Sequence, residues 1–374
     1  MKIAIARQKY TPFGGAERFV QRALDGLRAQ GVEVTIIARE WSGDASGILK
    51  VDPFYLGRTW RDVGFAFQVQ KIIAEGRFDL VQSHERIPGC HVFRAGDGVH
   101  ATWLELRDRA RGGLARLLTR QSPWHSYVKQ AEEQMFRHPN LRAVICNSAM
   151  VKRDIARRFQ VADDKLHVIH NGVDLERFHP GLRGDHRERV RQELGIAADA
   201  PVIAFVGSGF ERKGVFVLLR ALAAMERRDA HLLVVGKDRQ LDKAQALARR
   251  LGVESRVRFL GGREDVRPYY GAADLFCLPS LYDPMPNAAL EAFACGLPVV
   301  TSTTSGAAEL VEEGRNGAVC DALDGPALAQ RLAQLCAPGA AAAQGAAARA
   351  TVAALGTQAM TDRLAALYRS LTAA

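Results

Sequence analysis

Two segments in the second half of the chain combine glycines, cations and carboxylates in an order that suits a phosphate-bearing ligand. The first, VGSGFERKG, passes from a predicted strand into a predicted helix, so amides around Gly209 and the cationic groups of Arg212 and Lys213 can converge on one anion. A diphosphate fits such a set of donors. The segment is not a P-loop, because Gly214 is followed by Val215 where that motif has Lys and then Ser or Thr, and GxGxxG is absent. Adjacent cations at a helix start are also typical of a solvated helix face.

The second segment, LPSLYDPMPNAALEAFACGLPVV, predicts a strand, a loop, a helix and a further strand. At the helix opening, the amides of Asn287, Ala288 and Ala289 would face phosphate oxygens with the helix dipole behind them. Asp283 at the helix entrance and Glu291 one turn inside can accept hydrogen bonds from sugar hydroxyls. An acidic residue at a helix N-terminus can also serve the dipole alone, which suits Asp283 better than Glu291.

Length and composition predict two domains in a chain that folds by itself. At 374 residues the chain is long enough for two hydrophobic cores with a cleft between them. A hydrophobic content of 48% with 25% charged residues excludes wholesale disorder and fibrous classes. The net charge of +10 favours partners that carry phosphate: nucleotides, nucleic acid or an anionic membrane.

The cysteines and the N-terminus indicate the compartment. The six cysteines lie far apart, form no CxxC pair and mostly sit in apolar runs, so we expect reduced thiols in the core. The first apolar run is far too short for a secretory signal, and no stretch approaches the ~20 apolar residues of a membrane span. We therefore expect a cytoplasmic protein, soluble or peripherally attached to the inner membrane.

Both halves of the chain alternate predicted strands with predicted helices, which indicates α/β architecture with doubly wound parallel sheets. KIAIAR, a glycine-bearing loop, an amphipathic stretch and VEVTIIAR form the first βαβ unit. Residues 171–199 lack a long apolar strand and are the predicted linker. The tail from Pro338 is rich in alanine and carries Leu364, Leu367, Tyr368 and Leu371 at helical spacing, so it predicts a terminal helix.

The chain resembles the large family of retaining glycosyltransferases with two facing Rossmann-like domains, the GT-B fold of family 4. The resemblance spans nearly the whole chain and depends on FGGAERFV, HNGVD, GSGFERKG and the acidic pair followed by EAFACGLPVV. It implies an acceptor-binding domain at residues 1–171, a nucleotide-sugar-binding domain at 172–350, an interdomain cleft, and a helix at 351–374 that returns to the first domain.

The resemblance also implies roles for the residues of the two segments. Arg212 and Lys213 would hold the diphosphate, Glu291 the ribose hydroxyls, and the first acidic residue, Asp283, the donor sugar. The family usually has Glu at that first acidic position and often Gly or Phe in the loop that follows. Here Asp283 is followed by Pro284, Met285 and Pro286.

Within the family, YTPFGGAERF and PGCHVFRAGDGVHATWLEL are most similar to the lipopolysaccharide core glucosyltransferases that modify an inner-core heptose. This likeness implies a hexose donor, UDP-glucose, and a lipid-linked saccharide acceptor. Gly14 and Gly15 would form a loop that approaches the donor phosphate and the acceptor, because glycine permits close backbone approach. Asp97 takes the position near the reacting sugar that many relatives fill with His, and His100 is a rival for that role.

The chemistry implied is transfer without a metal or other cofactor. Cations and helix-terminal amides act where negative charge develops on the departing diphosphate. The sequence has no DxD pair and no His/Cys/Asp cluster at ligand spacing. The family resemblance further implies attack on the same face of the sugar, with the leaving phosphate accepting the proton.

A basic segment between Trp103 and Arg158 mixes arginines and lysines with aromatic residues and leucines, which is typical of a surface that seeks anionic lipid. The same pattern also fits a solvated helix face. No nucleic-acid module accompanies the arginines, so no nucleic-acid partner is expected. Three alternatives to glucosyl transfer remain: a mannosyl or other hexosyl transferase of the same family, a sugar-nucleotide epimerase, and a non-enzymatic basic protein that binds membrane or nucleic acid.

Overall fold

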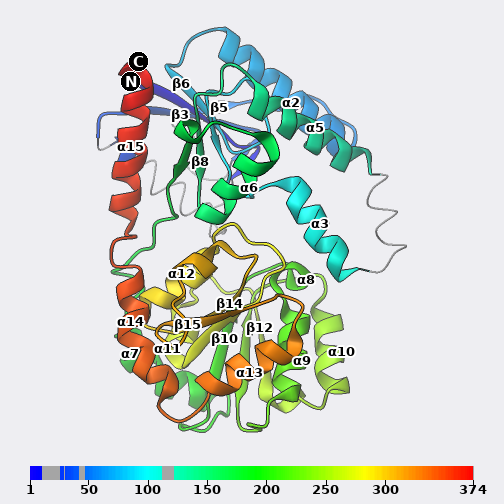
Figure 1. Cartoon of the computed structure of the whole chain (residues 1–374), viewed down its shortest axis with the longest axis vertical. Coiled ribbons are helices and arrows are strands. Elements are labelled where there is room, and N and C mark those ends of the chain that lie inside the picture. Colours follow the sequence, from blue (N-terminus) through cyan, green and yellow to red (C-terminus); the bar gives the residue numbers. More distant parts are fainter. Residues whose placement is uncertain (11–25, 29, 42–46, 112–121, 374) are drawn as a thin grey trace. The chain divides into compact units, whose positions relative to one another are not determined.

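Two sheets of parallel strands organise the computed structural model, which describes residues 1–10, 26–28, 30–41, 47–111 and 122–373. Each sheet belongs to its own unit (Figure 1). Unit 1 comprises Met1–Gly172 and Thr357–Ala374, and unit 2 comprises Val173–Gly356. The chain therefore crosses between units after Gly172 and after Gly356. The domain ends predicted from the sequence were residues 171 and 350.

The sheet of unit 1 has seven strands in the order β5-β3-β1-β6-β7-β8-β9. Its strands are β1 (Lys2–Ala6), β3 (Glu33–Ala38), β5 (Ile48–Lys50), β6 (Leu80–Ser83), β7 (Val92–Arg94), β8 (Ala143–Cys146) and β9 (Leu166–Val168). Its helices are α2 (Gly57–Ala74), α3 (His100–Ala110), α5 (Pro123–Arg137), α6 (Ala149–Phe159) and α15 (Thr357–Ala373), with a 3-10 turn η1 (Asp163–Lys165). A separate pair joins β2 (Lys9–Tyr10) to β4 (Glu40–Trp41).

The side chains of β1 alternate between two hydrophobic cores of unit 1. Ile3 and Ile5 pack in one core with residues of α15, whereas Ala4 and Ala6 pack in another with residues of α2. Successive side chains of an extended strand point to opposite faces of the sheet. Both sets are apolar here because both faces of this sheet are covered. The sequence KIAIA is apolar at both alternating sets, as a doubly wound sheet requires.

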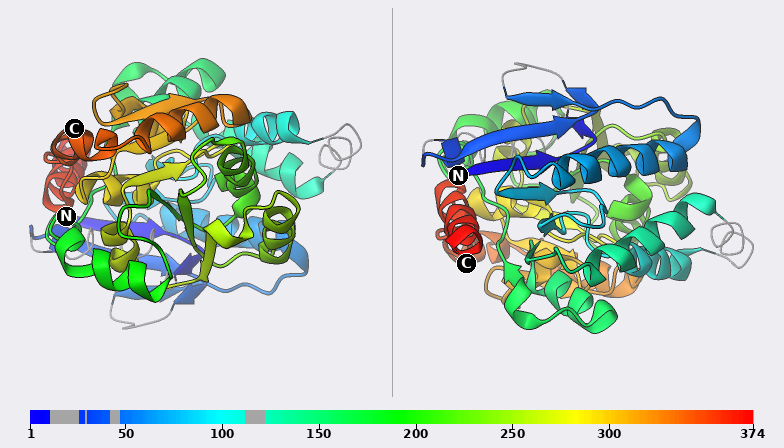
Figure 2. Two further views of the ribbon diagram at one scale, coloured as in Figure 1. Left: turned by 90° about the horizontal axis from the view of Figure 1, so that it is seen from below. Right: turned by 90° about the horizontal axis from the view of Figure 1, so that it is seen from above.

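The terminal helix α15 is an integral part of unit 1. Met360, Leu364 and Tyr368 lie on one face of the helix and are buried against the sheet. The hydroxyl of Tyr368 donates to Oε1 of Gln82, which lies on β6, at 2.6 Å. In Figure 2 the helix stands beside the strands of this unit. The predicted return of the C-terminal helix to the N-terminal unit is confirmed.

The sheet of unit 2 has six strands in the order β12-β11-β10-β13-β14-β15, the Rossmann order. Its strands are β10 (Val202–Val206), β11 (His231–Val235), β12 (Val257–Gly261), β13 (Leu275–Leu278), β14 (Val299–Ser302) and β15 (Gly317–Cys320). Its helices are α7 (Leu182–Glu193), α8 (Phe210–Lys213), α9 (Val215–Ala224), α10 (Leu241–Arg250), α11 (Arg267–Ala272), α12 (Asn287–Ala294), α13 (Gly325–Leu335) and α14 (Ala340–Thr351). Two 3-10 turns complete it, η2 (Glu254–Arg256) and η3 (Gly306–Leu310). Seen from below in Figure 2, helices flank this sheet.

The predicted linker at residues 171–199 is wrong, because most of the segment is packed into unit 2. Phe178, Leu182 and Val190 are buried in the unit 2 core, the last two on α7. The buried guanidinium of Arg191 donates to Oδ2 of Asp274 at 2.7 Å. The many charges of the segment led to the prediction of a solvent-exposed linker, yet several of these charged side chains bond α7 to the rest of unit 2.

The six cysteines are buried free thiols, which confirms the prediction of reduced core cysteines. Burial raises the pKa of Cys90 and Cys146 to about 12 each, so neither is a reactive thiolate near neutral pH. None of the helices in the described ranges is both long and apolar enough to cross a bilayer.

Candidate active site

The strand order of unit 2 brings the two predicted phosphate segments to one place. β10 and β13 are parallel neighbours, with Ile203 opposite Leu275 and Ala204 opposite Phe276. The chain leaves β10 toward β11 on one side, and β13 lies on the other side, so the loops after β10 and β13 open at a topological switch point. Ligands of doubly wound folds bind at such a point.

The loops after β10 and β13 are in direct contact. The amide of Leu281 donates to the carbonyl of Arg212 at 2.8 Å. Gly214 separates α8 from α9 with φ of 85°, and a Cβ at this position would overlap the carbonyl oxygen of Pro279. Glycine is thus required at this junction both by its backbone conformation and by the close approach of the second loop.

The cations of the first loop meet the first carboxylate of the second. The ammonium of Lys213 pairs with Oδ2 of Asp283, and Nη1 of Arg212 lies 3.6 Å from the same oxygen. Arg212 also donates to the carbonyl of Tyr282 at 3.1 Å. Asp283 is buried and Lys213 nearly so, whereas the Arg212 side chain is 38% exposed. The predicted Arg212, Lys213 and Asp283 therefore form one cluster.

Burial lowers the pKa of Lys213, and the like charge of Arg212 acts in the same direction, while Asp283 opposes both. A desolvated ammonium beside a guanidinium is a strong local source of positive potential. A dianionic diphosphate would relieve the repulsion between the two cations.

The amides of the glycine turn are not free, contrary to the prediction that they face a ligand. Oδ2 of Asp238 accepts from the amides of Gly209 at 2.6 Å and Phe210 at 3.0 Å. Asp238 follows β11, the neighbour of β10, so its carboxylate occupies the start of α8 as an anion would. Sequence reasoning missed Asp238, although an acidic residue just after a predicted neighbouring strand was a usable signal.

The second predicted carboxylate, Glu291, is held by a tyrosine from another helix. The hydroxyl of Tyr270 on α11 is shared between Oε2 of Glu291 at 2.9 Å and the carbonyl of Ala288 at 3.1 Å. Asn287 and Ala288 are half-buried in the first turn of α12, and the amide of Ala289 donates to the carbonyl of Pro286 at 3.0 Å. One of the three predicted amides is therefore already used within the turn.

The Asp283 loop is fixed by its neighbours. Pro284, Met285 and Pro286 are buried. The amide of Asp283 donates to the carbonyl of Thr304 at 3.2 Å, and its carbonyl accepts from Gly306 at 2.8 Å. The departure from the usual family loop thus gives a packed segment that holds the shorter carboxylate against Lys213.

The candidates in unit 1 lie at the carboxyl edge of its own sheet. The Asp97 side chain is 83% exposed, and its nearest cation is Nη1 of Arg86 at 3.7 Å. His100 is buried at the start of α3, where its amide donates to Oε1 of Glu132 at 3.1 Å and its Nε2 lies 2.9 Å from Nδ1 of His125. Burial lowers the pKa of His100 to about 3, so the ring is neutral near pH 7. Gly14 and Gly15 lie outside the described residues.

A small polar pocket of about 70 Å³ adjoins these residues in unit 1. Asp62 of α2 accepts from Nε1 of Trp124 at 2.7 Å and from Nε2 of Gln8 at 3.1 Å. Glu85, just after β6, accepts from the amide of Gln8 at 3.2 Å, and burial raises the pKa of Glu85. Tyr127 of α5 also lines the space. Sequence reasoning missed Asp62 and Glu85, which are far apart in the chain.

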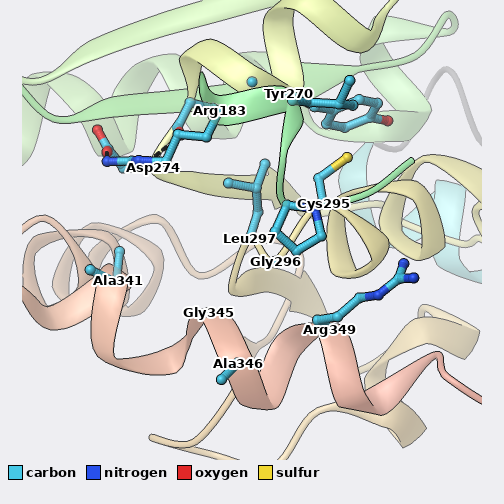
Figure 3. A pocket seen from close by; sticks show the side chains of 15 residues that line it. Arg183, Tyr270, Asp274, Cys295, Gly296, Leu297, Ala341, Gly345, Ala346 and Arg349 are labelled. Carbon is cyan, nitrogen blue, oxygen red and sulfur yellow. Dashed lines mark hydrogen bonds and ion pairs between the residues drawn. The ribbon is translucent and has the colours of Figure 1, made fainter. Parts of the chain in front are cut away.

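A larger cavity of about 560 Å³ lies elsewhere in unit 2 (Figure 3). Its wall is formed by α7, α11, α14 and the end of α12, including Arg183, Cys295 and Arg349. None of the predicted site residues lines it. Tyr270 connects the two places, because its ring lines the cavity and its hydroxyl reaches Glu291.

Within the described ranges, no group of three or more His, Cys, Asp or Glu side chains is arranged to hold a metal ion.

Several cations of the basic segment form internal ion pairs in its described part. Arg137 pairs with Glu133 at 2.9 Å, Lys152 with Asp163 at 2.8 Å, and Arg158 with Glu105 and Asp154. Arg107 is buried. Residues 112–121 of the segment lie outside the described ranges.

Comparison with known proteins identifies the family. A profile described as Glycosyltransferase Family 4 matches residues 13–177, and one described as Glycosyl transferases group 1 matches residues 200–337. Lipopolysaccharide glucosyltransferase WaaG of Escherichia coli K12 is 30% identical over 325 residues, 85% of each chain. The chain is a family 4 glycosyltransferase. This glycosyltransferase is also 33% identical over 328 residues to lipopolysaccharide core biosynthesis glycosyltransferase LpsE of Rhizobium meliloti, covering 86% of this chain and 85% of that one.

Solved structures agree with the family and the fold. The crystal structure of WaaG matches 98% of this glycosyltransferase and 99% of its own chain, with a TM-score of 0.83 and 26% identity. Anabaena HepE in complex with UDP-glucose matches 99% of this chain and 100% of its own with a TM-score of 0.73 and 22% identity, which shows the shared fold. The predicted α/β class with two Rossmann-like GT-B domains and the predicted enzyme class, a glycosyltransferase, are confirmed.

Proposed function

We propose that this glycosyltransferase transfers glucose from UDP-glucose to a heptose of the lipopolysaccharide inner core, with retention of configuration and without a metal. The observation that carries the proposal is the convergence of Arg212 and Lys213 on Asp283 where the loops after β10 and β13 touch. The choice of glucose and of a lipopolysaccharide core acceptor is supported by the names of WaaG and LpsE, and the choice of heptose by the sequence resemblance to inner-core glucosyltransferases.

In the donor half of the proposed reaction, Arg212 and Lys213 bind the diphosphate. Departure of UDP adds negative charge to the phosphate next to these cations, so they stabilise the transition state more than the ground state. As the diphosphate takes over Lys213, the Asp283 carboxylate becomes available to a hydroxyl of the donor sugar. Glu291, oriented by Tyr270, accepts from the ribose hydroxyls.

In the acceptor half, unit 1 supplies groups suited to a neutral polyol. Asp62 and Glu85 are acceptors in a pocket that also contains the aromatic Trp124 and Tyr127. The 70 Å³ of free space accommodates a hydroxyl-bearing edge and not a whole sugar ring. Asp97, exposed at the same edge, and the loop of Gly14 and Gly15 complete the proposed acceptor side. The acceptor hydroxyl attacks the face that UDP leaves, and the leaving phosphate accepts its proton.

The proposed acceptor is lipid-linked, which places the enzyme in the cytoplasm at the inner membrane. The basic segment from Trp103 to Arg158 is one proposed contact with anionic lipid. Its internal ion pairs limit how many of its charges can serve that contact.

A transfer assay with product analysis tests the proposal. The purified enzyme is incubated with UDP-glucose and a lipopolysaccharide core that ends in heptose, with EDTA present, and the product linkage is determined by NMR. We expect an α-linked glucose on heptose and release of UDP. A thermal-shift panel of UDP, GDP, ADP and their sugars identifies the donor, since a ligand that binds the native state raises its stability.

Matched incubations separate the alternatives. Conversion of the donor without acceptor would identify an epimerase, and turnover with a different sugar nucleotide would identify another hexosyltransferase. Absence of selective, saturable nucleotide binding would contradict an enzymatic role.

A further inference from the structure

The cavity of Figure 3 is a space of ligand size that the proposed chemistry does not use. Its volume of about 560 Å³ lies within the range of pockets that hold small molecules, roughly 300–1,000 Å³. Every residue that lines it belongs to unit 2. Of the described residues with a role in the proposed chemistry, only Tyr270 reaches it. The cavity is therefore a candidate for a second ligand.

The apolar part of the wall follows from the alanine-rich sequence of α14. Its small lining residues are Ala341, Ala342, Gly345 and Ala346. The helix meets the end of α12 closely at Gly345, where a Cβ would lie 3.1 Å from the carbonyl oxygen of Gly296. Beside this contact, side chains no longer than a methyl group leave space in front of Pro180, Leu182 and Leu297. The tail that forms a helix thus also borders an apolar cavity.

At another part of the wall, three arginines of α7 surround one carboxylate. Nη2 of Arg183 lies 3.2 Å from Oδ1 of Asp274. Arg187 donates to the same oxygen at 2.8 Å, and Arg191 to Oδ2 at 2.7 Å. Burial lowers the pKa of Arg191, the like charges of its two arginine neighbours add to this shift, and Asp274 opposes it. Of the three arginines, Arg183 has the longest contact, a side chain 48% exposed and a place in the cavity wall.

Arg349 brings a second guanidinium to the wall, from α14. It donates to the carbonyls of Ala294 at 3.0 Å, Phe178 at 3.1 Å and Leu175 at 3.3 Å. Carbonyl oxygens satisfy its N–H groups without neutralising its charge. In Figure 3 the helix that bears Arg349 lies on one side of the cavity, and Arg183 lies on the other. The wall therefore combines apolar surface with two cations and one carboxylate.

We propose that this cavity binds a small amphipathic anion, with its apolar chain against the alanine face of α14 and its carboxylate or phosphate head beside Arg183. The two kinds of wall favour this class of ligand. A bare inorganic anion would leave the apolar walls in water, and a neutral hydrocarbon would make no charge-assisted hydrogen bond with the guanidinium.

The position of the cavity connects such a ligand to donor binding. Tyr270 and Gly271 of α11 line it, and so does Cys295, which directly follows α12. The hydroxyl of Tyr270 joins these two helices by its bond to Glu291. A ligand in contact with both helices restrains them, so a donor that needs Glu291 in place loses less conformational freedom on binding. We therefore expect positive coupling between ligand and donor, and this coupling, though not the binding itself, rests on the proposed function.

Isothermal titration of the full-length enzyme with decanoate tests the binding. We expect saturable binding at one site per chain. Decanol, which has the same chain without the charge, should bind about tenfold more weakly, the loss of one charge-assisted hydrogen bond. Acetate, which has the head without the chain, should bind more weakly still. Decyl phosphate in a parallel titration shows which head group is preferred. Equal affinity for decanoate and decanol, or uptake without saturation, would overturn the proposal.

Two pairs of variants locate the bound decanoate. Ala346→Trp places a large side chain in the cavity, and Ala343→Trp adds the same side chain at an exposed position of α14 outside the lining. We expect the first to lose at least about tenfold in affinity for decanoate and the second to bind as the native enzyme does. Arg183→Gln should lose about tenfold for decanoate and nothing for decanol, whereas Arg189→Gln, at an exposed arginine of the same helix, should change neither. Native affinity in Ala346→Trp and Arg183→Gln would place decanoate elsewhere and overturn the proposal.

Titration of UDP with and without saturating decanoate tests the coupling. We expect decanoate to tighten UDP binding by about fivefold, and UDP to tighten decanoate binding by the same factor, as linkage requires. Tyr270→Phe keeps the ring and removes the hydroxyl, so it should bind decanoate and lose the coupling. An unchanged UDP affinity in the native enzyme would overturn the coupling. Absence of UDP binding under all conditions would contradict the proposed function instead, and the decanoate titrations would still report the cavity.

Discussion

The carboxyl edges of the two sheets carry different side chains on the same strand order. In each unit the first strand lies between the second and the fourth, so a switch point opens at that edge. At the switch point of unit 2, Arg212 and Lys213 meet one carboxylate. At the switch point of unit 1, Gln8 follows β1 and bonds Glu85, which follows β6. The unit 2 edge thus presents two cations around one carboxylate, whereas at the unit 1 edge Arg86 is paired with Glu132, and Asp62 and Glu85 offer hydrogen-bond acceptors.

This difference indicates that the loops after the strands, and not the sheets, determine which chemical groups each unit presents. The strands supply position alone, since their order and burial are nearly the same in both units. A cationic edge suits the diphosphate donor, and an edge with carboxylates and a neutral histidine suits hydroxyl groups. Substitutions at one edge should therefore affect one substrate.

The largest expected effect comes from removing both cations of unit 2. For Arg212→Ala/Lys213→Ala we expect kcat/KM for the donor to fall on the order of 10³-fold, because these groups stabilise the charge that develops on the leaving diphosphate. Steady-state kinetics with varied donor measures it. Arg220→Ala, an exposed arginine on α9, is the control and should be unchanged. Normal turnover by the double variant would remove the basis for the donor site.

The junction between the two loops of unit 2 should be sensitive to a single methyl group. Gly214→Ala places a Cβ against Pro279 and an alanine at positive φ, which should destabilise the fold by about 3 kcal/mol. Gly252→Ala shares the positive φ but meets no atom, and should cost about 1 kcal/mol. Urea unfolding compares the two. Equal losses would mean that the loops do not press together at Gly214.

Removing a carboxylate from unit 1 should affect the acceptor. Asp62→Ala removes the carboxylate that accepts from the indole of Trp124 and the side-chain amide of Gln8. We expect the acceptor KM to rise by about tenfold, the loss of roughly one well-placed hydrogen bond, with donor affinity unchanged. Kinetics with each substrate varied in turn would show it. A change confined to the donor would reverse the assignment of the two edges.

The smallest expected effect is a pH dependence that belongs to unit 2. Burial sets the pKa of Lys213 below its ordinary 10.5, so its positive charge is lost as pH rises through this lowered value. Donor affinity should therefore weaken in alkaline solution sooner than for Lys213→Arg, whose guanidinium stays charged. Isothermal calorimetry measures the donor affinity of both proteins at each pH. Ionisation of the nucleobase affects both proteins equally, so the difference in affinity reports the charge of Lys213. Parallel pH profiles would show that the ammonium does not bind the donor. His100, neutral above about pH 3, should contribute nothing in this range.

Much of the fold and part of the site were predictable from local signals. The strands are runs of apolar residues, and the glycines, Arg212, Lys213 and the acidic pair lie within two short segments at strand ends. Parallel neighbours then bring those ends together. These features need only short-range chemistry and one rule of topology.

The remaining features depend on contacts between distant parts of the chain. Asp238 at the start of α8 and Tyr270 on Glu291 come from other strands and helices of unit 2, and no local pattern couples them. Charged residues of α7 resembled a linker because their partners, such as Asp274, are about 80 residues away. The roles of Asp97, Gly14 and Gly15 stay predictions.

A structure of the enzyme with UDP tests the central claim most directly. We predict that the diphosphate lies within hydrogen-bond distance of Arg212 and Lys213, beside the first turn of α12, and that Lys213 loosens its pairing with Asp283. A diphosphate bound elsewhere, for example in the cavity of Figure 3, with the three side chains still paired among themselves, would contradict the account.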